Sequence, residues 1–259
     1  MSLLELREVS FAYRRDRPVL DNVSLSLGAG ANLGIVGESG SGKTTALRLL
    51  LGLARPQDGA VLFDGQPLDP GDHARMRTFR RSVQAVFQDP YSSLDPRQTV
   101  ARIVAEPLRA LGIEGDRRQA VERALVSVGL AADAMERYPH AFSGGQRQRI
   151  AIARAIVAGP RAVLADEAVS ALDLSTRARI VELFKSLSQT LSLVFVSHDL
   201  AVVASLCEEI AILEKGRIVE AGRTRDVLAA PRHPYTQRLL ASIPRMPDIA
   251  SFSPKGTTP

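Results

Sequence analysis

The chain has 259 residues, of which 45% are hydrophobic and 24% are charged, and its formal net charge is +5. This composition excludes an intrinsically disordered chain, and no apolar run approaches the roughly 18 residues that a membrane span needs. The single cysteine, Cys207, excludes an internal disulfide and a multi-cysteine metal site, and we expect it to be a small buried apolar residue. The basic excess suits nucleic acid or an anionic membrane surface, but equally a general arginine bias, because the basic residues are scattered.

The first third of the sequence predicts mainly strands and turns. The start, "MSLLELREVS", has charges where a signal peptide is apolar, so we expect a strand and a chain that stays in the cytoplasm. Strand character recurs over residues 20–27 and 59–68, and "ANLGIVG" (31–37) is an apolar run typical of a buried parallel strand. That run leads into a predicted helix, "KTTALRLLLGL", which should end around Gly52 and Pro56.

From residue 89 to 160 the pattern becomes helical, with apolar residues at helix spacing over 99–113, 116–130 and 144–159. Short β-rich runs then return at 161–167 and 191–199, separated by an amphipathic helix across 175–190, and residues 208–222 resemble a hairpin. The simplest architecture is an α/β core with a helical insertion between its early and late strands. The tail after Ile243 is rich in Pro and Ser and is expected to be loose.

Residues 37–44, "GESGSGKT", fit the phosphate-binding pattern G-x-x-x-x-G-K-[ST]. Glycines let such a loop turn tightly and point successive N–H groups at phosphate oxygens, and the following helix adds its positive N-terminus. Lys43 would reach the β- and γ-phosphates while the Thr44 hydroxyl holds Mg²⁺. The alternative is a plain Gly/Ser-rich turn, but the placement between a strand and a helix favours phosphate binding.

Asp166 and Glu167 end the apolar run "AVLADE", at the edge where a parallel sheet presents its ligand-binding residues. In a nucleotide site Asp166 would hold Mg²⁺ and Glu167 would polarise the attacking water. The alternative is that the two carboxylates only cap the next helix. The phosphate-binding pattern favours the first interpretation.

With "SGGQ" at 143–146, "SALD" at 170–173 and His198 after "LVFVS", the chain resembles the ATPase subunit of an ATP-binding cassette (ABC) transporter over residues 3–243. The resemblance implies a P-loop NTPase (RecA-like) α/β core with an N-terminal antiparallel β subdomain and an inserted α-helical subdomain. The core would comprise 1–88 and 161–230, the helical signature subdomain 89–160, and a C-terminal extension 231–259 with a disordered end.

The resemblance also implies roles for single residues, with ATP and Mg²⁺ as cofactors. Lys43, Gln88, Glu167 and His198 would be catalytic, and Thr44, Gln88 and Asp166 would hold Mg²⁺. Tyr13 would stack on adenine, and Asp173 would couple two sites across a dimer interface. The remaining nucleotide contacts would come from Gly37, Ser39, Gly40, Gly42, Thr45, Ser143, Gly144, Gly145 and Gln146. Without the family context, Tyr13 would be a strand aromatic, Gln88 a polar residue at a strand end, and Ser143 and His198 capping residues.

With one phosphate loop and one signature per chain, a single subunit cannot complete a site alone. The resemblance implies that two such subunits sandwich two ATP molecules head to tail. The resemblance implies a peripheral importer ATPase on the cytoplasmic face of the inner membrane, working with two membrane permease subunits and, indirectly, an extracytoplasmic solute-binding protein. The alternative is a soluble ABC ATPase acting on nucleic acid or ribosomes. The compact insertion, the lack of a second cassette and the lack of a long coiled coil favour transport and no nucleic-acid partner.

Residues 86–100, "VFQDPYSSLDPRQTV", and 233–240, "HPYTQRLL", resemble the oligopeptide, dipeptide and nickel permease ATPases. Members of that group usually pair two different ATPases, so we expect a heterodimer with a paralogous chain. Ala168 and Val169 depart from the commoner form of the motif, and no cysteine follows Cys207, so no iron–sulfur cluster is expected. The motifs leave open whether the cargo is a peptide, nickel, a metallophore or another small solute.

Overall fold

A six-stranded sheet forms the centre of the computed structural model, which describes residues 2–14 and 17–242. The strand order is β10-β9-β3-β8-β7-β6. Five of these strands run parallel, and β10 pairs antiparallel with β9. Their bounds are β3 (Asn32–Val36), β6 (Val83–Val86), β7 (Ala162–Asp166), β8 (Ser192–Ser197), β9 (Glu209–Glu214) and β10 (Arg217–Arg223). The buried parallel strands and the hairpin that the sequence predicts are therefore confirmed.

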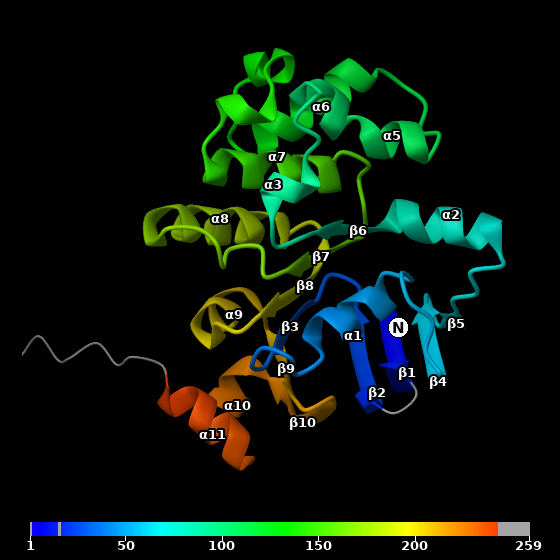
Figure 1. The fold of residues 1–259 in the computed structure, drawn as a ribbon, viewed down its shortest axis with the longest axis vertical. Helices are drawn as coiled ribbons and strands as arrows, with labels where there is room; N and C mark the ends of the chain where they lie inside the picture. The colour runs from blue at the N-terminus through cyan, green and yellow to red at the C-terminus, as the bar shows by residue number, and fades with distance from the viewer. Residues whose placement is uncertain (1, 15–16, 243–259) are drawn as a thin grey trace, which may run out of the picture.

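A second, antiparallel sheet is built from the N-terminal part of the chain in the order β2-β1-β4-β5. It contains β1 (Ser2–Arg14), β2 (Arg17–Gly28), β4 (Asp58–Phe63) and β5 (Gln66–Pro67). Alternation of apolar and polar residues gives these strands one buried face, which packs on helix α1 (Lys43–Leu50). Figure 1 shows α1 lying between this sheet and the central one.

The central sheet is covered on both faces, which explains why β3, β7 and β8 are buried along their whole length. Strand β8 illustrates the arrangement, because its side chains alternate between two apolar clusters. Leu193 and Phe195 face the cluster that includes the helical lobe, whereas Val194 and Val196 face the cluster around α1. Phe195 also meets Phe184 edge to face, with ring centroids 5.4 Å apart.

A helical lobe is inserted between β6 and β7 and lies at the top of Figure 1. Its α-helices are α3 (Pro90–Ser93), α4 (Val100–Val104), α5 (Glu106–Ala110), α6 (Arg117–Ser127) and α7 (Gly144–Ile156), with short 3-10 turns η1 (Ala132–Glu136) and η2 (Pro139–Ala141). The three helical segments predicted from the sequence in this region are present. Residues 99–113 are divided between α4 and α5, which meet at Ala105, and Pro107 lies in the first turn of α5.

One helix in the first third was not predicted. Helix α2 (His73–Ser82) precedes β6, and only Met76 and Phe79 on it are buried. Four of its ten residues are arginines, so its sequence lacks the regular helical spacing of apolar residues by which a helix is predicted. The Asp72 side chain accepts a hydrogen bond from the Arg75 N–H and caps its first turn.

The last third adds α8 (Leu174–Leu187), α9 (Leu200–Leu206), α10 (Thr224–Ala229) and α11 (Pro234–Ala241). Cys207 is buried, and burial raises the pKa of its thiol to about 12. The predicted loose tail after Ile243 lies outside the described residues. Within 2–14 and 17–242, no helix combines the length and the apolarity of a membrane span.

Candidate functional site

The carboxyl ends of four neighbouring strands meet at one edge of the central sheet, and the predicted catalytic residues follow them directly. The phosphate loop (residues 37–44) follows β3, Gln88 follows β6 after one residue, Glu167 follows β7, and His198 follows β8. Because these strands are parallel, the four segments leave the sheet on the same side. A cavity of about 290 Å³ lies there, and its lining includes Lys43, Gln88 and Glu167.

The phosphate loop has the conformation that an anion site needs. Gly42 has a φ of +109°, and a side chain there would approach Leu20 to 2.8 Å, so glycine is required at this turn. Gly42 is also the N-cap of α1 and offers no side chain to the first amides of that helix. The first N–H groups of α1 and the positive end of its dipole therefore face the cavity.

Lys43 is buried inside the loop, with a side chain that is 5% exposed. Its Nζ donates to the carbonyl oxygens of Gly37 at 2.7 Å and Glu38 at 2.9 Å, and lies 3.9 Å from Glu167 Oε1. Burial lowers the pKa of Lys43, and the neighbouring carboxylates of Glu167, Asp166 and Glu38 act against that shift. The ammonium group is thus partly stripped of water and ready to pair with a stronger anion.

Asp166 and Glu167 occupy different environments although they are adjacent. Asp166 is buried, and its Oδ1 accepts a hydrogen bond from Thr44 Oγ1 at 3.4 Å. Burial raises the pKa of Asp166, and the Thr44 hydroxyl and Lys43 act in the other direction. Glu167 is less buried and has a φ of +44°, a left-handed backbone that residues other than glycine rarely adopt.

Glu167 is the residue on which the other catalytic candidates converge. Gln88 Nε2 lies 3.4 Å from its Oε2, and His198 Nδ1 lies 3.4 Å from its Oε1. The carboxylate therefore has an ammonium, an amide and an imidazole around it, on three separate loops. Such a cluster can orient a water molecule and stabilise charge that develops on a transferred phosphoryl group.

Comparison with known protein families agrees with the ATPase interpretation of these residues. A family model described as ABC transporter matches residues 20–170, and one described as oligopeptide/dipeptide transporter, C-terminal region, matches residues 219–258. The chain belongs to the ABC transporter family. The second match assigns this ABC ATPase to the oligopeptide/dipeptide branch that the sequence motifs indicate.

Curated relatives of this ABC ATPase are named for import. A protein of Brucella ovis that is provisionally named as a peptide import ATP-binding protein is 46% identical over 230 residues, which are 87% of this chain and 73% of that protein. The glutathione import ATP-binding protein GsiA of Salmonella typhimurium is 46% identical over 234 residues. The chain spans only 38% of the length of GsiA. These names support the importer interpretation over an ATPase acting on nucleic acid.

Solved structures confirm the predicted fold class. The cbiO1 subunit of Clostridium perfringens, part of the ABC transporter complex cbiONQ, superposes with a TM-score of 0.78 at 25% identity, covering 88% of this chain and 91% of that one. A dimeric ATP-binding cassette in a post-hydrolysis state with ADP and Pi superposes with a TM-score of 0.76 at 30% identity, covering 86% and 99%.

The signature residues of this ABC ATPase lie apart from the cavity. Ser143 caps α7 in the helical lobe: its Oγ accepts from the Gln146 N–H at 3.4 Å, and Gln146 Oε1 accepts from the Ser143 N–H at 2.9 Å. The lining of the cavity consists of Val19, Ser39, Gly40, Gly42, Lys43, Thr44, Thr45, Gln88 and Glu167, with no signature residue. The structure therefore brings together the phosphate loop, the acidic pair, Gln88 and His198, but not residues 143–146.

Tyr13 and Asp173 lie at the surface. The Tyr13 side chain is 57% exposed, and its hydroxyl oxygen lies 3.4 Å from Thr45 Oγ1 and accepts from Arg48 at 3.2 Å. The ring thus lies beside the start of α1, largely exposed, with Phe11 packed edge to face against it at 4.9 Å. Asp173 caps α8 and accepts from the Thr176 N–H at 3.0 Å, and this bond holds the pKa of the carboxyl well below its usual range.

Sequence reasoning missed one residue of this cluster, Ser170. Its hydroxyl donates to the Glu167 carbonyl oxygen at 2.9 Å, and its Oγ lies 3.4 Å from Gln88 Nε2. Ser170 therefore ties the unusual backbone of Glu167 to the glutamine that approaches it. Its position in "SALD" was the available signal, but the motif does not tell which of its residues turns toward the cavity.

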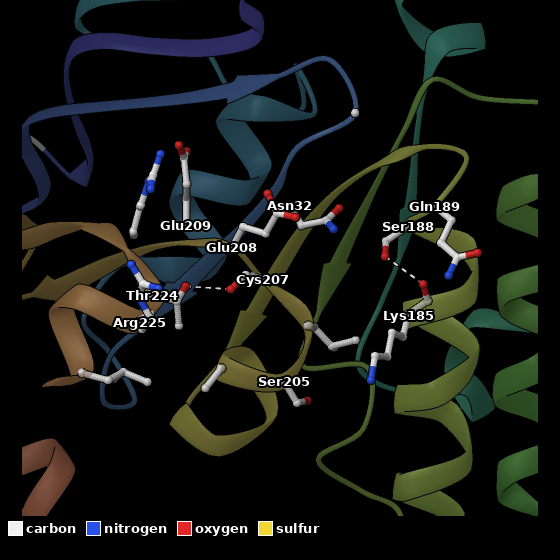
Figure 2. A pocket seen from close by; sticks show the side chains of 15 residues that line it. Asn32, Lys185, Ser188, Gln189, Ser205, Cys207, Glu208, Glu209, Thr224 and Arg225 are labelled. Atoms are coloured by element: carbon white, nitrogen blue, oxygen red, sulfur yellow. Dashed lines mark hydrogen bonds between the residues drawn. The ribbon is translucent and has the colours of Figure 1, made fainter.

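A larger cavity, of about 940 Å³, lies at the opposite edge of the sheet, where β3 and β9 begin. Figure 2 shows Asn32 at the start of β3, Glu208 and Glu209 on the β9 side, and Lys185 and Gln189 from the end of α8. No residue assigned above to ATP or Mg²⁺ belongs to its lining. The larger cavity therefore contains none of the residues expected to bind the nucleotide.

Proposed function

We propose that this chain hydrolyses ATP at the edge of the sheet where Lys43, Gln88, Glu167 and His198 meet, and that it powers the import of a peptide. Glu167 acts as the general base that polarises the attacking water, and Lys43 and His198 contact the γ-phosphate. The observation that supports this most directly is the approach of Lys43, Gln88 and His198 to the Glu167 carboxylate, at 3.9, 3.4 and 3.4 Å.

Mg²⁺ fits the oxygen donors of this site. The Thr44 hydroxyl and the Asp166 carboxylate lie 3.4 Å apart, and the Gln88 side-chain oxygen is on the adjacent loop. Mg²⁺ prefers such hard oxygen ligands and keeps several waters and phosphate oxygens, so a few protein ligands suffice. When bound with ATP, Mg²⁺ neutralises phosphate charge, while Thr44 and Asp166 fix where that charge lies.

In this proposal the site is completed by a second ATPase subunit, which is a paralogous chain. In this proposal Ser143, Gly144, Gly145 and Gln146 contact the ATP bound by the partner, and the partner's signature contacts the ATP bound here. The exposed Asp173 and the separation of α7 from the cavity favour this exchange over a site completed within one chain.

We propose that this chain binds two membrane permease subunits at the cytoplasmic face of the inner membrane. Its ATP-driven conformational change is transmitted to them. A groove of about 350 Å³ between the segment that follows α1, Phe87 and α5 suits a permease segment. Leu53 and Phe87 are 65% and 40% exposed there, beside Pro107 and Leu111. Arg80, Glu106 and Arg154 supply charge at the same groove.

The cargo is proposed to be a peptide, delivered by an extracytoplasmic binding protein that does not touch this chain. The names of the relatives, which mention glutathione and peptide import, favour a peptide over nickel or a metallophore.

Replacement of Glu167 by Gln tests the proposed chemistry. The variant keeps the size and hydrogen-bonding reach of the side chain but cannot accept the proton of the attacking water. We expect ATP turnover in the assembled transporter to fall by about 10²-fold or more, with ATP still bound by the variant chain. Glu114→Gln, an exposed change away from the cavity, is the matched control and should keep wild-type turnover. Turnover by the Glu167 variant within a few-fold of wild type would refute the assignment of the base.

A further inference from the structure

The C-terminal motif "HPYT" builds a short helix whose start is fixed to the central sheet. The Glu220 carboxylate on β10 accepts the N–H groups of Arg232 at 2.9 Å and His233 at 3.1 Å. His233 Nδ1 then accepts from the Tyr235 N–H at 3.2 Å and caps α11. The first residues of the motif thus determine where Tyr235 lies.

Tyr235 reaches from α11 to the phosphate loop. Its side chain is 3% exposed, and its hydroxyl oxygen accepts a hydrogen bond of 2.8 Å from the backbone N–H of Glu38. Burial raises the pKa of Tyr235, so the group stays a neutral hydroxyl at physiological pH. Arg238 lies 5.7 Å from the ring centroid and pairs with Glu214 on β9, which holds the helix over the sheet.

The peptide unit between Gly37 and Glu38 is held on both sides. Its N–H donates to Tyr235, and its C=O, the Gly37 carbonyl, accepts from Lys43 Nζ at 2.7 Å. Because a trans peptide is planar and its N–H and C=O point in opposite directions, fixing one group orients the other. A side chain at Gly37 would approach the Leu213 carbonyl to 2.2 Å, so the loop packs closely on β9 here and the peptide has little room to turn.

We propose that Tyr235 is a positioning residue for ATP binding, which orients the Gly37 carbonyl and, through it, the Lys43 ammonium group. The C-terminal helix then forms part of the nucleotide site without touching the nucleotide. This inference rests on the proposed ATP-binding role of the phosphate loop. The "HPYT" motif, which identifies the branch of the family, would then also have a role in nucleotide binding.

The test is Tyr235→Phe in the full chain, which removes the hydroxyl and keeps the ring. Titration with a fluorescent ATP analogue should show a Kd raised by about fivefold or more, because the Glu38 N–H loses its acceptor and the loop loses its alignment. Hydrogen exchange should accelerate in the peptide that contains the Glu38 amide. In the assembled transporter, the KM for ATP should rise more than kcat falls. An unchanged Kd would overturn the proposal, whatever the exchange at Glu38.

Two further comparisons make the result unambiguous. Tyr138→Phe, at a tyrosine that is 43% exposed and stacks on His140, should leave Kd and exchange as in wild type. Faster exchange confined to the phosphate loop and α11 supports positioning, whereas faster exchange throughout the sheet would mean a general loss of stability and overturn it. If the wild-type chain fails to bind the analogue, the proposed function fails as well. If wild type and Tyr235→Phe bind it equally, only the role of Tyr235 fails.

Discussion

Single ionisable residues at the cavity are held in states that a protein interior disfavours. Burial raises the pKa of Asp166 and lowers the pKa of Lys43, so the charged form of each group is less stable here than in water. They compensate each other only in part, and Thr44 supplies the hydrogen bond that Asp166 receives. Perturbed pKa values of this kind are concentrated at functional sites. A bound phosphate would give the Lys43 ammonium group an anionic partner, and a bound metal ion would give the Asp166 carboxylate a cationic one.

Asp166→Asn should therefore have opposite effects on stability and activity. The folded-state pKa of Asp166 lies above its unfolded value, so the folded protein holds this proton more tightly. Its contribution to stability then decreases as pH rises above about 4. We expect the Tm of the variant relative to wild type, both without nucleotide, to be higher at pH 7 than at pH 4.5. ATP turnover should be lost. A Tm difference that is the same at both pH values, or that shrinks toward pH 7, would contradict this account.

At the scale of elements, several helices begin with an aspartate whose carboxylate caps the first turn. Asp72 accepts from the Arg75 N–H at α2, and Asp173 accepts from the Thr176 N–H at α8. Only Asp173 lies at the motif proposed to couple two ATP sites. The two caps therefore form a natural pair for separating a structural from a functional role.

Asp72→Ala should cost about 1 kcal/mol of stability through the loss of the α2 cap, without a change in ATP turnover. Asp173→Ala should also lower Tm, because α8 loses its cap, but it should in addition reduce turnover in the assembled transporter. Urea unfolding and ATPase assays on both variants make the comparison. Equal turnover in the two variants would leave Asp173 with a capping role only.

Strands and motif loops could be predicted from the sequence because their signals are local. The apolar runs before Gly37, Glu167 and His198 identify buried parallel strands, and parallel strands necessarily direct their ends to one edge. Helix α2 could not be found in this way, because its arginines leave only Met76 and Phe79 as a buried face. The left-handed backbone of Glu167 was also not predictable, since it depends on Ser170 and the loops around it.

At the scale of the whole molecule, the phosphate loop and the signature lie on different bodies of the fold. Figure 1 shows α7 in the helical lobe above the sheet and α1 below it. This separation follows from the three-dimensional path of the chain and is not visible in the spacing of motifs. The contact between Tyr235 and Glu38, which are 197 residues apart, belongs to the same class of feature.

Ser143→Ala and Lys43→Ala should for this reason behave differently in two assays. In the isolated chain, Ser143→Ala should bind ATP like wild type, whereas Lys43→Ala should bind it roughly tenfold or more weakly. In the assembled transporter, both changes should reduce turnover, Ser143→Ala because the partner's ATP loses a contact. Weakened ATP binding by isolated Ser143→Ala would instead mean that the site is completed within one chain.

The buried Cys207 has a practical consequence for experiments on the assembled complex. It is the only cysteine of the chain, it is 4% exposed, and its pKa of about 12 leaves almost no thiolate at neutral pH. Maleimide probes react with thiolates, so they should pass over the native chain. A cysteine introduced on an exposed loop, for example at Glu114, would then receive a fluorophore or spin label alone. Distances between subunits during the ATP cycle can thus be measured without first removing a native thiol.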